Sequence, residues 1–153
     1  MPVGYRWVFV RKHNEKNETM KYKAWLVAQG FSQRPCIDYN ETYAPVIDAI
    51  TFRFLISLVV TENLDMCLMD VIIAYLYGSL DNDTYMKIPE GYKVPNAHNS
   101  TSQNIYSIKL QRSPYRLKQS ERMWYNRLSE YFLKEGFENN PICPCFFIKR
   151  SEF

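Results

Sequence analysis

One carboxylate, Asp70, stands near the end of an apolar run from Leu64 to Val71, just before the segment Ala74–Leu76. The run has the length of a buried strand, and the segment after it is typical of a helical turn. A buried carboxylate costs free energy unless it is compensated, and a divalent cation such as Mg²⁺ could do this because hard cations bind oxygen ligands. The alternative is an Asp that has reached solvent or caps the next turn. The spacing alone favours this alternative.

Two lysines could bind phosphate groups. Lys21 and Lys23 alternate with Tyr22 and Ala24 in a predicted strand, so both ammonium groups leave the same face. That pair could hold a triphosphate or a nucleic-acid backbone. The alternative is a solvated pair that protects a strand edge from further pairing, and the pattern alone favours it.

Charge is unevenly distributed along the chain. Residues 5–34 hold seven Lys or Arg and two acids, residues 38–91 hold nine acids and two bases, and residues 109–127 hold six bases and one acid. Basic rims around an acidic centre would suit a phosphate polymer, and Lys21, Arg116 and Lys118 are the candidate nucleic-acid contacts. Charges scattered over solvated faces explain the pattern equally well.

The pattern of apolar residues predicts an α+β fold in one domain. Strands are predicted from β-branched and aromatic runs and helices from apolar residues at intervals of three to four. The expected strands cover 7–10, 20–28, 64–71, 85–88, 105–110 and 145–149, and the expected helices cover 51–62 and 120–135. The first two strands form a hairpin, helix 51–62 is apolar enough to be buried on two sides, and residues 91–103 form a polar insertion.

Composition narrows the class of protein. The 153 residues are 46% hydrophobic with a net charge of +3, which is typical of a folded domain. No secretion signal and no apolar run long enough to span a membrane is evident, so we expect an intracellular protein, cytoplasmic or nuclear. The four cysteines lack metal-ligand spacing and are expected to be reduced thiols.

Seven sequence blocks match one family in order. They are RWVF (6–9), YKAWLVAQGFSQ (22–33), IDYNETYAPV (37–46), MDVIIAYLYGSL (69–80), YMKIPEGY (85–92), LKQSERMWY (117–125) and PCFFIKR (144–150). Through these blocks the chain resembles the reverse transcriptase domain of copia-type (Ty1/copia) retrotransposons, an RNA-directed DNA polymerase. The blocks span nearly the whole chain, which makes a chance match implausible.

The resemblance implies specific roles. Asp70 matches the first of three aspartates that hold two Mg²⁺ ions for nucleotidyl transfer, and Val71 would add a backbone carbonyl to one ion. Tyr75 matches the aromatic residue beneath the incoming sugar, and Lys23 lies in the block that contacts the triphosphate. The implied partners are an RNA or DNA primer–template and a dNTP, with no membrane.

The implied architecture is a partial polymerase of fingers and palm, with an antiparallel sheet packed on helices. Fingers would comprise about 1–48 and 77–118, and palm about 49–76 and 119–153. No oligomeric state follows from the sequence.

This chain departs from the family pattern at several positions. Trp25 replaces an arginine, which removes a cation near the triphosphate. Arg116 replaces a glycine before the Leu-Lys-Gln motif and, if the glycine allows close approach to substrate, would crowd the pocket. A polar pair is replaced by Ile72-Ile73, and a proline by Glu121.

The family's Tyr-Xaa-Asp-Asp hairpin, which carries the other two aspartates, follows the Pro-Cys strand and is not in this sequence. We therefore expect a fragment of a Pol polyprotein reverse transcriptase that is inactive as this chain, because one carboxylate cannot hold two metals. The alternatives are a polymerase completed by residues supplied elsewhere, a decayed transposon remnant without function, and a non-catalytic nucleic-acid-binding module.

Overall fold

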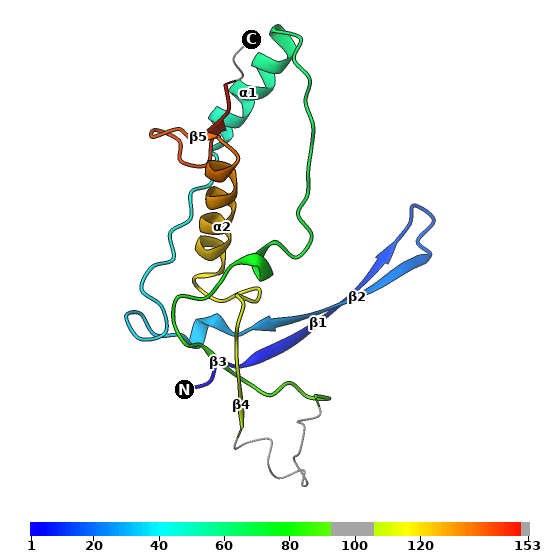
Figure 1. Ribbon diagram of the computed structural model, residues 1–153. Coiled ribbons are helices and arrows are strands. Elements are labelled where there is room, and N and C mark those ends of the chain that lie inside the picture. Colours follow the sequence, from blue (N-terminus) through cyan, green and yellow to red (C-terminus); the bar gives the residue numbers. More distant parts are fainter. Residues whose placement is uncertain (93–105, 151–153) are drawn as a thin grey trace.

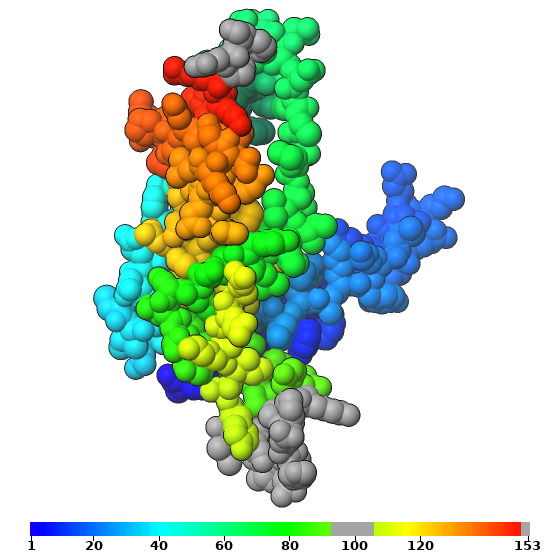
Figure 2. Space-filling model, viewed as in Figure 1, coloured from blue at the N-terminus to red at the C-terminus, as the bar shows by residue number. Residues whose placement is uncertain are grey.

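A long β-hairpin projects from the body of the protein in the computed structural model, which describes residues 1–92 and 106–150 (Figures 1 and 2). Strands β1 (Tyr5–His13) and β2 (Thr19–Ala28) pair antiparallel, as predicted. Asn14 closes the turn because its side-chain oxygen accepts from the backbone N–H groups of Lys16 and Glu18. This Asn therefore sets the register of the two strands.

Two further pairs of short strands complete the β structure. Strand β3 (Tyr85–Lys87) pairs with β4 (Ser107–Lys109), and β5 (Glu138–Asn139) pairs with β6 (Phe147–Ile148). The described residues thus form three separate two-stranded antiparallel sheets, which agrees with an α+β fold but not with one sheet packed on helices. The predicted polar insertion 91–103 lies almost wholly outside the described residues.

The predicted strand over Leu64–Val71 is wrong. These residues are extended without strand pairing and are exposed, and they run between helix α1 (Ala49–Thr61) and the short 3-10 helix η2 (Ala74–Tyr77). A strand needs partners for its backbone N–H and C=O groups. No described segment pairs with this run.

Helix α1 begins two residues before its predicted start and is not buried. Asp48 caps it by accepting from the N–H groups of Ile50 and Thr51, and the Thr51 hydroxyl donates to the same carboxylate. The Thr51 contacts hold the pKa of Asp48 below its usual value. No residue of α1 is buried, and Ile50 is 79% exposed. The expectation of burial on two sides is therefore wrong for the described residues.

Helix α2 (Ser120–Lys134) matches its prediction within one residue and is the longest helix described. Its C-terminal end packs on the β5–β6 pair through Phe132, whose ring centroid lies 5.1 Å from Phe137 and 5.0 Å from Phe147. No helix in the described part of the chain is long and apolar enough to cross a membrane.

The buried core is small and lies where β2 ends. Val3, Ala28 and Leu117 form its centre, with Leu80 and Leu110 packed against them. Val3 also bridges to β3, because its N–H donates to Tyr85 O and its carbonyl accepts from Lys87 N–H. The core therefore joins the base of the hairpin to the segment that precedes α2.

Candidate functional site

The connecting segment (residues 112–119) lies between β4 and α2 and crosses the base of the hairpin. Its backbone is bonded on two sides, since Ser113 N–H donates to Gly78 O and Ala28 N–H donates to Tyr115 O. Buried Ser120 closes its end by donating to Pro114 O at 2.6 Å. The segment is thereby held between the end of β2 and η2.

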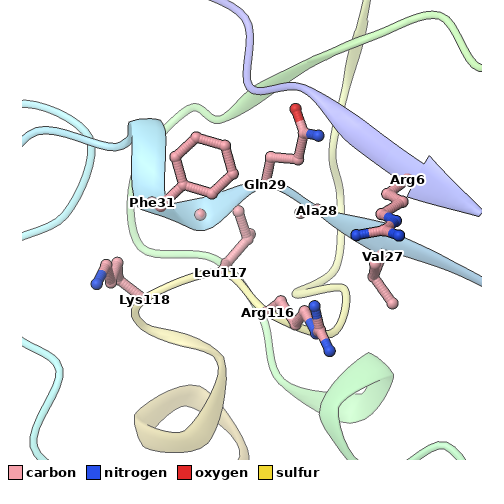
Figure 3. A pocket seen from close by; sticks show the side chains of 9 residues that line it. Arg6, Val27, Ala28, Gln29, Phe31, Arg116, Leu117 and Lys118 are labelled. Carbon is pink, nitrogen blue, oxygen red and sulfur yellow. The ribbon is translucent and has the colours of Figure 1, made fainter. Parts of the chain in front are cut away.

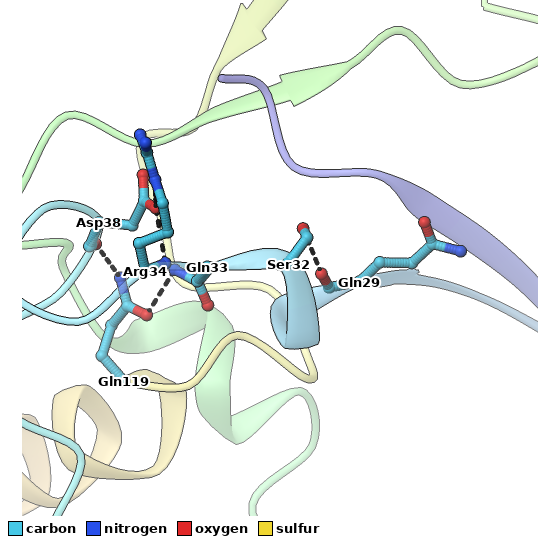
Figure 4. Close-up of polar contacts among 6 residues, drawn as sticks. All are labelled: Gln29, Ser32, Gln33, Arg34, Asp38 and Gln119. Carbon is cyan, nitrogen blue, oxygen red and sulfur yellow. Dashed lines mark hydrogen bonds and ion pairs between the residues drawn. The ribbon is translucent and has the colours of Figure 1, made fainter.

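A buried amide pair fixes the far end of this segment (Figure 4). Gln119 is fully buried, and its side-chain oxygen accepts from Gln33 Nε2 at 3.0 Å, while its own Nε2 donates to Asp38 O. Gln33 Oε1 accepts from the backbone N–H of Lys118 at 2.8 Å. An amide can donate and accept at once, which suits a buried link between two loops. We did not predict this role, although both glutamines lie inside the matching blocks.

A cavity of about 400 Å³ opens beside the connecting segment (Figure 3). Arg116 and Lys118, both predicted nucleic-acid contacts, line it with exposed side chains, and buried Leu117 between them anchors the backbone. Arg6 of β1 adds a third cation that the sequence analysis did not single out. This cavity is therefore suited to an anionic group.

Glycine is required at one wall of this cavity. A Cβ on Gly30 would lie 2.1 Å from Arg116 O, which is far inside contact distance. Gly30 therefore allows the end of β2 to approach the backbone of the connecting segment closely. Position 116 has a different requirement, because Arg116 adopts φ +70°, a left-handed conformation that favours glycine.

The predicted phosphate ligands Lys21 and Lys23 do share one face of the hairpin. Lys21 is paired with Lys12 and Lys23 with Val10, so Lys12 lies on the same face. Lys12 lowers the pKa of Lys23 most, a small desolvation and Lys21 lower it further, and Asp70 acts in the opposite direction. Lys12 was missed because the bulge after it hides the register.

Arg6 extends this cationic face to the cavity. Arg6 pairs with Val27, which also lines the cavity, so Arg6 and the three lysines lie on the same side of the hairpin. We call this surface, made of Arg6, Lys12, Lys21 and Lys23, the cationic hairpin face. From Arg6 to Lys12 it extends for about 20 Å, given the rise of an antiparallel strand.

Trp25 lies within the cationic hairpin face, where the resemblance leads us to expect arginine. It pairs with Val8, and Lys23 Nζ is 5.7 Å from its ring centroid. The indole therefore contributes a cation–π contact in place of a charge.

Asp70 is exposed and does not end a buried strand. The desolvation argument for a compensating cation therefore fails. Asp70 and the Val71 carbonyl would be donors for the Mg²⁺ that the resemblance implies. Among residues 1–92 and 106–150, no three His, Cys, Asp or Glu side chains gather as metal ligands. The described residues do not make up a two-ion site.

Tyr75 does not line the cavity beside Arg116 and Lys118. It lies on η2, half-buried, with its ring 4.8 Å from Tyr115 in an edge contact. Burial raises the pKa of Tyr75, and Glu121 and Tyr115 add to this. Tyr75 lines a second cavity of about 320 Å³ with Glu121. The structure thus brings Tyr75 next to the connecting segment.

The residue before η2 is strained. Ile73 adopts φ +54°, and a β-branched side chain in this region is rare because its Cβ crowds the backbone. Ile73 is one of the two isoleucines that replace a polar pair. The departures at 73 and 116 therefore both fall on left-handed residues.

Most of the chain is similar in sequence to known proteins. A model of the family described as "Reverse transcriptase (RNA-dependent DNA polymerase)" matches residues 1–152. The chain is 39% identical over 138 residues, 90% of its length, to the retrovirus-related Pol polyprotein from transposon RE1 of Arabidopsis thaliana, and 32% identical over 149 residues, 97% of its length, to that from transposon TNT 1-94 of Nicotiana tabacum. A Gag-Pol polyprotein of transposon Ty1 in Saccharomyces cerevisiae is 27% identical over 143 residues, 83% of the chain.

The chain matches only a small part of each of these longer polyproteins. The chain spans 9% of the RE1 polyprotein, 11% of the TNT 1-94 polyprotein and 7% of the Ty1 one. No solved structure matches it. The family match covers nearly every residue described above, including the connecting segment, the cationic hairpin face and Asp70. The chain belongs to the reverse transcriptase (RNA-dependent DNA polymerase) family, within the Pol polyproteins of copia-type retrotransposons.

Proposed function

We propose that this chain is the part of an RNA-directed DNA polymerase that holds the template and the incoming nucleotide, with Asp70 as one metal ligand. The supporting observation is the continuity of the cationic hairpin face with the cavity lined by Arg116 and Lys118. A face about 20 Å long matches several successive phosphates of a nucleic-acid strand. Lys23 would contact the triphosphate, and Tyr75 the sugar.

The division into fingers (1–48 and 77–118) and palm (49–76 and 119–153) is part of this proposal. It is supported by contacts that join segments distant in sequence. The hairpin base bonds to β3 through Val3 and to the connecting segment through Ala28, all within the proposed fingers, while η2, of which residues 74–76 belong to the proposed palm, packs along α2.

Nucleotidyl transfer would need further carboxylates beside Asp70, and the described residues supply none within a ligand cluster. The 153-residue chain alone is therefore proposed to bind nucleic acid without extending a primer. The test is primer extension with Mg²⁺ and dNTPs on the purified chain. Extension that is lost in Asp70→Ala would overturn this part of the proposal.

Binding is tested separately by fluorescence anisotropy of a labelled primer–template at several salt concentrations. Each phosphate contact contributes a slope of about −0.9 to the log–log plot, so Lys118→Gln should reduce the slope by about one. Lys134→Gln, an exposed lysine on α2 away from the cavity, is the matched control. A slope near zero in the unmodified chain contradicts the proposed phosphate contacts.

A decayed remnant without activity is the second candidate. The specific observation in its favour is that Ile73 and Arg116 both occupy left-handed backbone positions. Such residues are tolerated where selection for stability is weak. The anisotropy experiment separates the two candidates by affinity, because a remnant without function retains at most weak binding through its basic residues.

A further inference from the structure

Two thiols meet in the loop between β5 and β6. Cys143 Sγ and Cys145 Sγ are 3.3 Å apart, with Pro144 between them. Both residues are half-buried, whereas Cys36 and Cys67 are exposed. Within the described residues, no other pair of thiols approaches to hydrogen-bonding distance.

Side chains on both sides of the loop hold these thiols together. Asn140 Oδ1 accepts from the N–H groups of Ile142 and Cys143 at 2.9 and 3.0 Å. The carbonyl of Pro144 accepts from Tyr125 on α2 at 2.9 Å and from Asn139 Nδ2 at 2.6 Å. The loop backbone closes through Phe146 N–H, which donates to Cys143 O at 2.8 Å. The proximity of the thiols is therefore built into the fold.

We propose that Cys143 and Cys145 form an oxidisable dithiol that closes to an internal disulfide when it meets a small-molecule disulfide. The sulfurs need to approach from 3.3 Å to about 2.05 Å, the length of an S–S bond. Cys145 also lines the 320 Å³ cavity, which gives solvent and small reactants access to the pair. A dithiol without a third ligand is better suited to this chemistry than to zinc, which takes four ligands.

The reaction proceeds in two exchange steps. The Cys143 thiolate attacks one sulfur of glutathione disulfide, forms a mixed disulfide and releases one glutathione thiolate. Cys145 then loses its proton to solvent and attacks Cys143 Sγ, which forms the Cys143–Cys145 bond and releases the second glutathione. The pair loses two electrons and two protons, and glutathione disulfide gains them. Burial, then the contact with Cys143, raises the pKa of Cys145, so less of Cys145 is thiolate and it is the poorer first nucleophile.

The test uses the full chain in glutathione redox buffers, with acid quenching, alkylation, digestion and mass spectrometry. Cys143 and Cys145 should lose two hydrogens together, while Cys36 and Cys67 acquire glutathione. The folded loop holds each thiol at a high effective concentration near the other, and unfolding lowers this concentration. The equilibrium constant for forming the Cys143–Cys145 disulfide should therefore fall about tenfold in urea. In Cys145→Ser, Cys143 should retain a glutathione adduct.

Asn140→Ala keeps both thiols but removes the side-chain acceptor that orders the loop. In this variant, the equilibrium constant for closing the pair should lie between the value of the unmodified native chain and the value in urea. The proposal is overturned if the native pair ends as glutathione adducts, if it stays reduced while Cys36 and Cys67 react, or if the constant is the same in urea.

Discussion

Arg116 occupies a backbone position that suits glycine, and this has a measurable consequence for stability. At φ +70° an L-residue loses about 1–2 kcal/mol relative to its preferred conformations. Arg116→Gly removes this strain, but glycine adds about 0.5–1 kcal/mol of unfolded-state entropy that must be lost on folding. We therefore expect Arg116→Gly to stabilise the chain by about 0.5–1 kcal/mol.

Lys118→Gly is the matched control. Lys118 lines the same cavity, is also exposed and does not have a positive φ. Both variants remove one positive charge and add one glycine, so their difference isolates the strain. Lys118→Gly should lose about 0.5–1 kcal/mol for the entropy of glycine alone.

Urea unfolding followed by tryptophan fluorescence measures both variants. With a slope of about 2 kcal/mol/M, the midpoint should rise by about 0.3–0.5 M for Arg116→Gly and fall by a similar amount for Lys118→Gly. The slopes themselves should not change. Equal losses in the two variants would refute the strain argument. Both variants should weaken primer–template binding alike, which separates stability from recognition.

Three further predictions follow from single contacts. Asp48→Ala removes the cap of α1 and should lower the unfolding midpoint, whereas Asp65→Ala, an exposed residue, should not. The pKa of Asp48 is lower in the folded chain than in the unfolded chain, so its carboxylate stabilises the fold above the unfolded pKa. This stabilisation is lost as the pH falls through the folded pKa, so the unfolding midpoints of Asp48→Ala and Asp65→Ala should converge in acid. Lys12→Gln should raise the pKa of Lys23, measured by NMR titration, since the largest cause of its depression is removed; an unchanged value contradicts the register-based contact. Gln33→Ala leaves the buried side-chain oxygen of Gln119 without its donor and should cost about 1–3 kcal/mol in urea unfolding; a loss near zero would mean that water replaces the bond.

Elements that depend on local pattern were predictable. The hairpin, α2 and α1 follow from alternation and helical spacing, and each was found within a few residues. Strand β5 was missed because its two polar residues carry no periodicity. The alternation in the second strand also predicted that Lys21 and Lys23 share one face, as the register shows, and Arg116 and Lys118 line one cavity.

Features that depend on distant partners were not predictable. The bond between Gln33 and Gln119 joins residues 86 apart, and nothing local distinguishes them from solvated glutamines. The left-handed backbone at Arg116 was also hidden, because the expected glycine could equally have served a close approach to substrate. A glycine expected at a position can serve either a left-handed backbone or a close approach, and the sequence does not tell the two apart.

The run from Leu64 to Val71 was predicted as a strand but has no partner strand among the described residues. Its residues favour a strand, and Leu68 is 94% exposed although it is among the most apolar of them. Pattern can specify that a segment is able to form a strand, but pairing requires a second segment with free backbone groups. Exposed apolar residues on α1 make the same point, since a helix can be capped and regular without a surface to cover it. Asp70 therefore lies on an exposed, unpaired segment rather than at the end of a sheet strand.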